Sequence, residues 1–278
     1  MSFFAYVETE VRRTRPDWPA ARPDQQRPGD DMRLFYSPFH KFIHKVLVTA
    51  HEAGLWDEME RVAVFPFKTL AGSDGGEPYS ITAINPLNKV PTLALDDGTV
   101  IYASQAIVEY LDSRNRTGHK LYPAPGPARW NALRRLALSD TIFESMVMLV
   151  MEGWYDEKTR HMATYEWLWP KMIRGLDVLE AESAGFADID IGQIATLHAL
   201  SYFDFVKDFY DAEDPIHPNY DWREGRPGLV KWYEKMLKRP SVQSHYMKDW
   251  EGDQGENPER CQEAVAIVLE AQRRNGTS

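Results

Sequence analysis

The chain has 278 residues, 43% of them hydrophobic, which is enough for two ordinary domains with apolar cores. Its 42 acidic residues outnumber its 32 lysines and arginines, and a formal net charge of −10 repels nucleic acid and anionic membranes. The single cysteine, Cys261, excludes an internal disulfide and a metal cluster with cysteine ligands. We therefore expect a globular protein of a reducing, cytoplasmic compartment with neither nucleic acid nor a membrane as partner.

The N-terminal 31 residues lack the apolar run and the cleavage site of a secretory signal. Residues 14–31 are rich in Pro, Arg, Asp and Gln, which bury too little apolar surface to offset the entropy of ordering. We predict a loosely held arm over residues 1–31. Because no run of about 18 apolar residues occurs, we expect no helix that spans a bilayer.

Residues 32–65 have the pattern of a strand, a helix and a second strand. The apolar run 32–36 (MRLFY) ends at a Ser-Pro turn and predicts a buried strand. From 41 to 53, apolar residues recur with a period of 3.6, and Gly54 stands where a left-handed C-cap belongs, so we predict a helix. Residues 60–65 (ERVAVF) predict a second strand, which a right-handed crossover places parallel to the first.

A hairpin and a helix follow a long loop. Residues 66–78 contain three glycines and form a longer connection than most, so we predict an insertion near the functional site. Apolar runs at 92–95 and 99–102 flank an Asp-Gly turn, which is a hairpin signal. Ser104 is expected to cap a helix that ends near residue 112. With the preceding unit, these elements predict an α/β domain whose mixed four-stranded sheet has the order βαβ-ββα.

The second half of the chain predicts an all-helical domain. Three prolines and a glycine at 121–127 break helix formation and mark a linker. Asp190 and Gln193 form a capping pair for one of the helices. The expected helices are 128–153, 164–183, 191–210, 228–238 and an amphipathic 258–274. The expected domains are the arm 1–31, a sheet domain 32–116, a linker 117–127, a helical domain 128–250 and a C-terminal extension 251–278.

Two runs of the sheet domain, 85–93 (NPLNKVPTL) and 101–111 (IYASQAIVEYL), resemble the glutathione-binding half of glutathione transferases. Runs at 136–145 (LALSDTIFES), 192–205 (GQIATLHALSYFDF) and 227–240 resemble the helical domain of bacterial members. The resemblance covers about residues 32–245. It implies a thioredoxin-like N-terminal domain before the bundle, glutathione as cosubstrate, no metal, and a homodimer that packs one subunit's small domain on the other's bundle.

The resemblance also implies docking roles for single residues. In the family the proline at the place of Pro91 is cis, and the main chain of Val90 would pair with the cysteinyl part of glutathione as an added strand pairs with a sheet edge. Ser104, at a helix start that favours anions, would hold the γ-glutamyl carboxylate. Lys89 would meet the glycyl carboxylate. Without a ligand, these residues would be a strand-initiating proline, a helix cap and a solvated lysine.

One polar anchor of the family pattern is missing. Many relatives have an acidic residue or a glutamine just before the serine, where it helps to hold the ammonium group of the ligand. This chain has Ala103 at that place. The resemblance leaves Gln105 and Glu109 as substitutes.

The thiol-activating position departs from the family as well. Alignment along the first helix places His40 where relatives carry Tyr, Ser or Cys. A free thiol with a pKa of about 8.5 is mostly protonated at neutral pH, so a transferase must stabilise the thiolate. His40 would donate a hydrogen bond from a ring N–H to the sulfur, act as a base or supply positive charge. Ser37 would be the alternative donor, through its hydroxyl. The alternative is that His40, His44 and Lys41 only form a polar surface and no thiol is activated.

The second substrate is expected between the two domains, against the first long helices of the bundle. An apolar, adaptable pocket there would be lined by Met146, Met148, Met151, Trp154 and Tyr155, although most of these have the spacing of core residues. Trp130, Trp167 and Trp169 are core or interface candidates without assigned chemistry.

The sequence thus predicts a glutathione transferase that adds the sulfur of glutathione to a small, partly apolar electrophile. Two alternatives stay open. One is a noncatalytic relative that carries ligands or binds other proteins, which Ala103 and His40 favour. The other is a glutathione-dependent isomerase or dehalogenase, which would use the same docking residues on a different electrophile.

Overall fold

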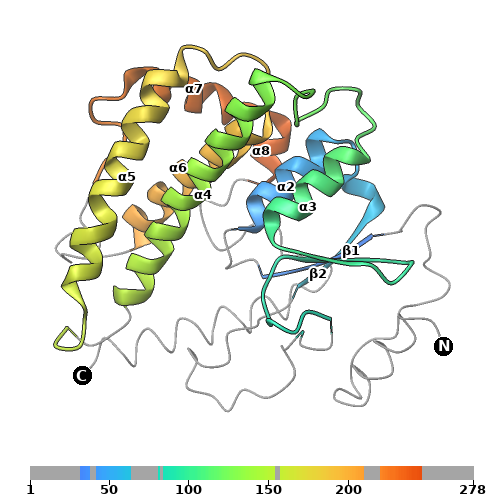
Figure 1. Ribbon diagram of the computed structural model, residues 1–278, viewed down its shortest axis with the longest axis horizontal. Helices are drawn as coiled ribbons and strands as arrows, with labels where there is room; N and C mark the ends of the chain where they lie inside the picture. The colour runs from blue at the N-terminus through green and yellow to red at the C-terminus, as the bar shows by residue number, and fades with distance from the viewer. Residues whose placement is uncertain are drawn as a thin grey trace. The chain divides into compact units, whose positions relative to one another are not determined.

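The computed structural model describes residues 32–37, 42–63, 81, 84–153, 157–209 and 220–245. The described residues divide into two compact units, and the division falls between Thr117 and Gly118. The first unit contains the strands and two α-helices, and the second is helical (Figure 1). The predicted arm, the glycine-containing loop at 66–78 and the C-terminal extension lie outside the described residues.

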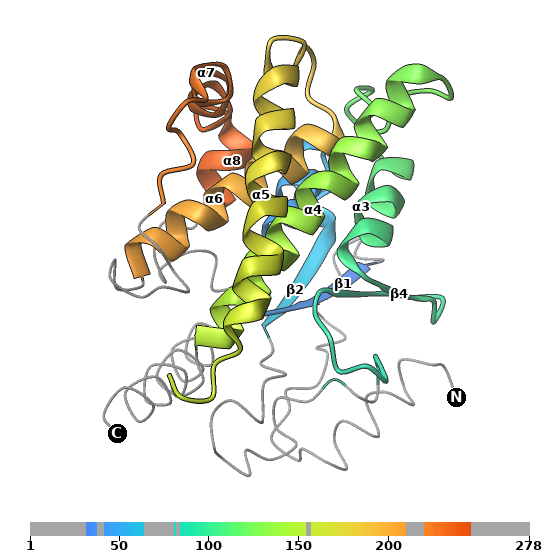
Figure 2. The same ribbon diagram turned by 60° about the vertical axis from the view of Figure 1, so that its left-hand side comes forward.

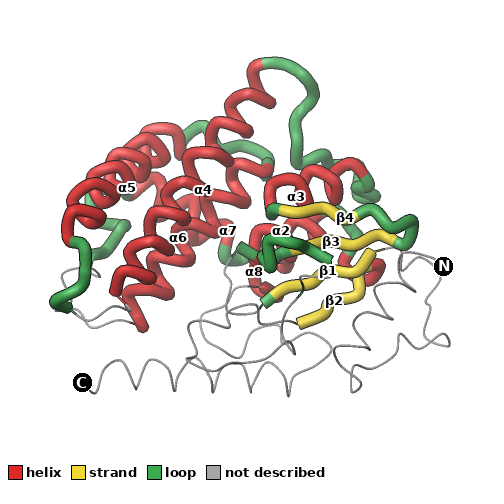
Figure 3. The backbone as a smooth tube through the Cα atoms, turned by 60° about the horizontal axis from the view of Figure 1, so that its bottom comes forward, coloured by secondary structure: helices red, strands yellow, loops and turns green. Residues whose placement is uncertain are grey.

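The first unit is a mixed four-stranded sheet with two helices on one of its faces (Figure 3). Its strands are β1 (Met32–Tyr36), β2 (Met59–Ala63), β3 (Thr92–Leu95) and β4 (Val100–Tyr102), in the order β2-β1-β3-β4. β1 pairs parallel with β2 and antiparallel with β3, and β3 pairs antiparallel with β4. The predicted α/β domain is therefore confirmed. β4 begins one residue later than predicted, because Thr99 still belongs to the turn, where its C=O accepts the Leu95 N–H at 2.9 Å.

Helix α2 (Ile43–Glu52) connects the parallel strands through a short 3-10 helix, η2 (Trp56–Glu58). It ends as predicted, with Gly54 at φ +69° and its N–H donated to the His51 C=O at 3.0 Å. His44 belongs to this helix and is only 8% exposed, so it is no part of a polar surface. Helix α2 begins two residues later than predicted.

Helix α3 (Ser104–Ser113) follows the hairpin directly. The prediction that Ser104 caps this helix is wrong. The N-cap is Ala103, whose C=O accepts the first helical hydrogen bond, from the Ile107 N–H at 3.1 Å. Ser104 is instead the first helical residue, and α3 has no side-chain cap from the described residues.

A small apolar cluster covers one face of the sheet. Successive side chains of a strand point to opposite faces, so the register places Phe35, Val62 and Ala94 on the same face. The cluster consists of Phe35, Ile81, Ile84, Val90 and Ala94, with Val62 and Val100 packed against it. The connection that leads into β3 is thereby anchored to the sheet through its own apolar side chains.

The second unit is all-helical, as predicted, and Figure 2 shows its two longest helices side by side. Its helices are α4 (Pro127–Gly153), α5 (Met162–Ser183), α6 (Ile191–Phe209), α7 (Pro227–Met236) and α8 (Pro240–His245). The short α8 has no counterpart in the prediction, which ended the preceding helix near residue 238. Within the described ranges, no helix is both long and apolar enough to cross a membrane.

Helices α4 and α6 approach each other closely at Gly192. A Cβ atom added there would lie 2.5 Å from the C=O oxygen of Ala132. Asp190 caps α6, since its Oδ1 accepts the Gln193 N–H at 2.8 Å. The predicted capping pair is only half correct, because the Gln193 side chain donates to the C=O of Asp188 at 2.6 Å instead of reaching back to residue 190.

Candidate functional site

Three predicted site residues come to the same edge of the sheet. The strand register aligns Phe35 with Thr92, and Thr92 with Tyr102. Ser37 and Ser104 follow this rung by two residues and Val90 precedes it by two. Because β3 runs antiparallel to β1 and β4, these offsets all point the same way along the sheet. The edge where β1 and β4 end and β3 begins therefore brings together Ser37, Val90 and Ser104.

Ser37 directly follows β1 and has a buried hydroxyl. Its exposed fraction is 0%, and its Oγ has no hydrogen-bond partner among the described residues. A buried polar group without a hydrogen bond lowers the stability of the fold by roughly 1–3 kcal/mol, so such groups are rare and often have a functional role. His40, the other predicted thiol-activating residue, lies outside the described residues.

Val90 presents its main chain at the same edge. It is 6% exposed, and its side chain packs in the apolar cluster on the sheet. The Val90–Pro91 peptide bond is cis, which confirms the expectation from the resemblance. Its N–H and C=O have no hydrogen-bond partner among the described residues. Main-chain groups of buried residues are almost always paired, so Val90 leaves one donor and one acceptor unmatched at this edge.

The N-terminus of α3 forms the third part of the edge. Ser104 is 7% exposed, and its hydroxyl makes no hydrogen bond with a described residue. Ala103 just before it has φ +65° and ψ +134°, a region that residues other than glycine rarely adopt, at a cost on the order of 1–3 kcal/mol. An uncapped helix N-terminus carries partial positive charge and favours an anion.

The remaining predicted docking residues are solvent-exposed. Lys89 precedes Val90 in the connection to β3, and Gln105 is the second residue of α3. Both side chains are exposed, as is Glu109 one turn further along α3. Lys89 and Gln105 are the chain neighbours of Val90 and Ser104, so they stand next to the edge with exposed side chains.

A pair of buried polar residues at this edge has no predicted role. Asn85 is 1% exposed, and its Nδ2 donates to the Lys89 C=O at 2.9 Å and to the Thr92 Oγ1 at 3.0 Å. The Thr92 hydroxyl donates to the same carbonyl at 2.8 Å. A signal was present in the sequence, since an asparagine and a threonine stand at the two ends of the turn, where such side chains often bond to the main chain.

The apolar residues predicted to line a pocket for the second substrate differ in their exposure to solvent. Met146 is 4% exposed and belongs to the core of the helical unit, while Met148 and Met151 are 48% and 42% exposed on α4. Trp154 and Tyr155 lie outside the described residues. Trp130 and Trp167, at 69% and 60% exposure, are not core residues.

The edge offers unmatched main-chain groups, an uncapped helix N-terminus and a buried hydroxyl. An extended peptide with a terminal carboxylate satisfies the first two, by strand-like pairing and by charge. A hydroxyl donor beside such a ligand stabilises a developing anion. Within the described parts of the chain, no three His, Cys, Asp or Glu side chains gather to hold a metal ion.

Comparison with known proteins leads to one family. The family model "Glutathione S-transferase, N-terminal domain" matches residues 40–114. A glutathione transferase family member from Pseudomonas fluorescens Pf-5, solved with bound glutathione, is 31% identical and has a TM-score of 0.63. The match covers 76% of this chain and 97% of that protein.

Two further relatives extend over the same share of the chain. A glutathione S-transferase from Methylobacillus flagellatus KT, solved with glutathione bound, is 28% identical with a TM-score of 0.65, over 76% of this chain and 97% of that one. The uncharacterized GST-like protein YibF of Escherichia coli K12 is 26% identical over 76% of this chain and 96% of its own. The chain described here belongs to the glutathione transferase superfamily and is of the bacterial type.

Proposed function

We propose that the protein binds glutathione at the sheet edge and transfers its thiol to a small, partly apolar electrophile. The main chain of Val90 next to Pro91 pairs with the cysteinyl part of the tripeptide. Ser104 and the uncapped N-terminus of α3 hold the γ-glutamyl carboxylate, and Lys89 meets the glycyl carboxylate. The observation that carries the proposal is the convergence of unmatched polar groups at this edge.

Ser37 assists the thiol in this proposal. Ser37 lies two residues after Phe35, and Val90 lies two residues before Thr92, the partner of Phe35 in β3. The buried Ser37 hydroxyl has no partner among the described residues, so it donates a hydrogen bond to the glutathione sulfur. That bond favours the thiolate and lowers the pKa of the bound thiol. The thiol proton leaves to solvent, and the thiolate electron pair forms a carbon–sulfur bond with the electrophile. Where the electrophile has a polarised double bond, its π bond breaks and the product takes up a proton from solvent. Where it has a leaving group, that group departs with the electron pair of the broken bond. His40 is the second candidate for this role, and Gln105 assists at the ammonium group.

Titration calorimetry with glutathione and S-methylglutathione at neutral pH tests the docking. Millimolar glutathione should also raise the thermal midpoint, because a ligand that prefers the native state stabilises it. We expect Ser104→Ala to weaken binding of both ligands. Ser37→Ala should leave S-methylglutathione binding unchanged and raise the pKa of bound glutathione, read by thiolate absorbance. Wild-type protein that shows neither heat nor stabilisation would refute the proposal.

A noncatalytic role is the second candidate, and one observation favours it. Ala103 occupies the position before Ser104 with an apolar side chain, so the edge lacks a side-chain acceptor for an ammonium group at that position. A ligand carrier or protein-binding module of this fold would bind glutathione weakly and show no turnover with any electrophile. His40→Ala and Ser37→Ala kinetics on an electrophile panel separate this candidate from the first.

We further infer a cytoplasmic homodimer. The single cysteine is typical of proteins from a reducing compartment. The resemblance to the family implies a dimer in which the small domain of one subunit packs on the helical bundle of the other. Sedimentation velocity at micromolar concentration distinguishes a monomer of 32.1 kDa from a dimer.

A further inference from the structure

The turn that leads into β3 is held from the inside by one buried side chain. Asn85 is 1% exposed, and its Oδ1 accepts the Leu87 N–H at 3.0 Å. Both hydrogens of its amide are donated within the same turn, to the Lys89 C=O and the Thr92 Oγ1. The side chain therefore ties the beginning of the turn to its end.

The bonds of this turn converge on the carbonyl of Lys89. It accepts one hydrogen bond from Asn85 Nδ2 at 2.9 Å and a second from Thr92 Oγ1 at 2.8 Å. Thr92 is 0% exposed and is paired in the sheet with Phe35 and Tyr102. The sheet residue Thr92 thus helps to fix the orientation of the Lys89 carbonyl, which does not depend on the exposed Lys89 side chain.

The Lys89 carbonyl and the Val90 N–H belong to one peptide unit. This peptide is trans, since the cis bond of the turn follows Val90, so its C=O and N–H point in opposite directions. Two hydrogen bonds on the carbonyl side fix the plane of the unit and aim the Val90 N–H away from Asn85. That N–H has no partner among the described residues, and Val90 is 6% exposed.

We propose that Asn85 and Thr92 are positioning residues for ligand binding, which act through the Lys89–Val90 peptide and present the Val90 N–H to glutathione. This inference rests on the proposed function. The two residues act in two ways, because they set the direction of the N–H and because a carbonyl that accepts hydrogen bonds polarises its peptide and strengthens the N–H as a donor. Neither side chain touches the ligand.

The test compares S-methylglutathione affinity by calorimetry at 15 °C for wild type, Asn85→Ala, Thr92→Val and Thr92→Ser. We expect Asn85→Ala and Thr92→Val to weaken binding about five- to tenfold, the equivalent of one misplaced hydrogen bond. Thr92→Ser keeps the hydroxyl and should bind within about twofold of wild type. In steady-state kinetics the KM for glutathione should rise, with little change in the KM for the electrophile.

The matched control is Asn88→Gly. Asn88 lies in the same turn, its Oδ1 accepts the Ile81 N–H at 3.0 Å, and its φ of +49° suits glycine. This variant loses a side-chain bond of the turn without touching the Lys89 carbonyl, so a purely structural role of the turn predicts equal loss of affinity. We expect its affinity to stay within about twofold of wild type. In a nitrogen-15 spectrum, the Val90 amide resonance should shift in Thr92→Val and return in Thr92→Ser.

The outcomes separate the two proposals. Wild-type protein that does not bind S-methylglutathione overturns the proposed function and this inference together. Wild-type binding with unchanged affinity in Thr92→Val, or equal losses in Asn88→Gly and Asn85→Ala, overturns the positioning role alone. If Asn85→Ala fails to fold, the Thr92→Val and Thr92→Ser pair still decides.

Discussion

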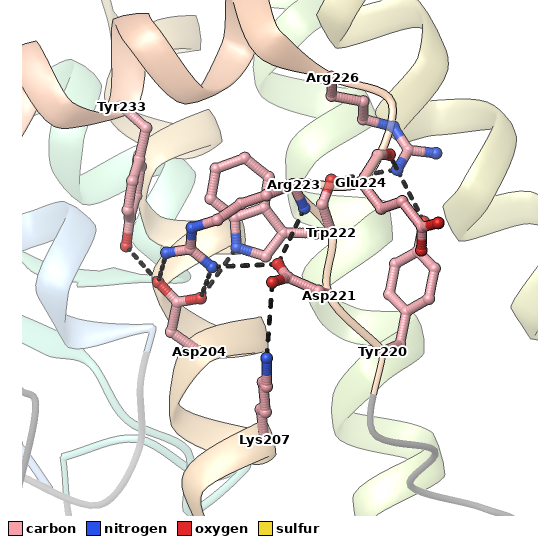
Figure 4. A network of polar contacts seen from close by, with 9 residues as sticks. All are labelled: Asp204, Lys207, Tyr220, Asp221, Trp222, Arg223, Glu224, Arg226 and Tyr233. Carbon is pink, nitrogen blue, oxygen red and sulfur yellow. Dashed lines mark hydrogen bonds and ion pairs between the residues drawn. The ribbon is translucent and has the colours of Figure 1, made fainter.

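The helical unit contains a carboxylate whose removal should be far more damaging than that of its neighbour. Asp204 on α6 accepts hydrogen bonds from Arg223 at 2.6 and 2.8 Å, from the Trp222 Nε1 at 2.9 Å and from the Tyr233 hydroxyl at 3.0 Å (Figure 4). Its side chain is 18% exposed. The four donors come from α7 and the turn before it, so this carboxylate fastens that segment to α6.

Asp221 contacts the same guanidinium in a different setting. It lies 3.4 Å from Arg223 and 3.5 Å from Lys207, and its side chain is 43% exposed. Hydrogen bonds to charged groups contribute about 1.5–3 kcal/mol each, whereas exposed ion pairs contribute about 0–1 kcal/mol. Because Arg223 is itself 36% exposed, solvent weakens its hydrogen bonds to Asp204 below the range for buried charged groups. We therefore expect Asp204→Asn to lose about 2–3 kcal/mol of unfolding free energy in total. Asp221→Asn should lose less than about 1 kcal/mol.

Urea denaturation of the two variants measures the difference. The midpoint of Asp204→Asn should fall with an unchanged slope, and its thermal midpoint should drop by about 4–10 °C, against less than about 4 °C for Asp221→Asn. Equal losses in the two variants would refute the argument from burial. A loss below about 1 kcal/mol in Asp204→Asn would show that the four bonds only replace bonds to water.

Three further predictions concern packing, backbone conformation and pH. Gly192→Ala should cost about 1–3 kcal/mol in urea denaturation, because its Cβ meets the Ala132 C=O at 2.5 Å, whereas Gly185→Ala, whose Cβ lies 3.4 Å from its nearest neighbour, should be neutral. Ala103→Gly should stabilise the fold by about 1 kcal/mol, since glycine accepts φ +65° without strain; a loss of thermal stability would contradict this. Burial raises the pKa of Asp221, but the Arg223 N–H, Lys207 and the Arg223 guanidinium outweigh it and hold that pKa below its usual value of 3.8. This contribution to stability is present above pH 3.8 and is lost as the pH falls through the lowered pKa, so Asp221→Asn should flatten the acid limb of a urea-midpoint profile.

Much of the fold could be predicted because local patterns and tertiary packing agree. The apolar run at 92–95 became β3 without a change of boundary, since the Asp-Gly turn that follows it leaves no alternative register. The helices of the second half were recognisable because each buries one face of a 3.6-residue repeat. The short α8 was missed because six residues contain too few turns for a period to appear.

Side-chain environments were harder to predict than elements. Trp130 and Trp167 were assigned to core or interface from residue type alone, and their high exposure excludes the core. The polar helix start that His44 suggested is absent at that residue, because α2 buries every residue from Ile43 to Ala50. Hydropathy reports what a side chain prefers on average, and burial on all sides of one helix is decided by tertiary neighbours.

The docking residues illustrate a further limit of reading a site from side chains. In the proposed function, the groups offered to glutathione are the main chain of Val90, the N-terminus of α3 and two hydroxyls, so a large part of the recognition would come from main-chain groups. Ala103 shows the consequence, because it lacks the polar side chain that the resemblance leads us to expect and still has a φ of +65°, which an alanine adopts only under constraint. A backbone held in that conformation without its usual side chain indicates that the surrounding sheet and helix enforce it. If the proposed function holds, the departure at Ala103 should lower affinity for the ammonium group of glutathione and leave the geometry at Ser104 intact. Ala103→Gln tests this, and we expect it to raise the affinity for glutathione without changing the fold.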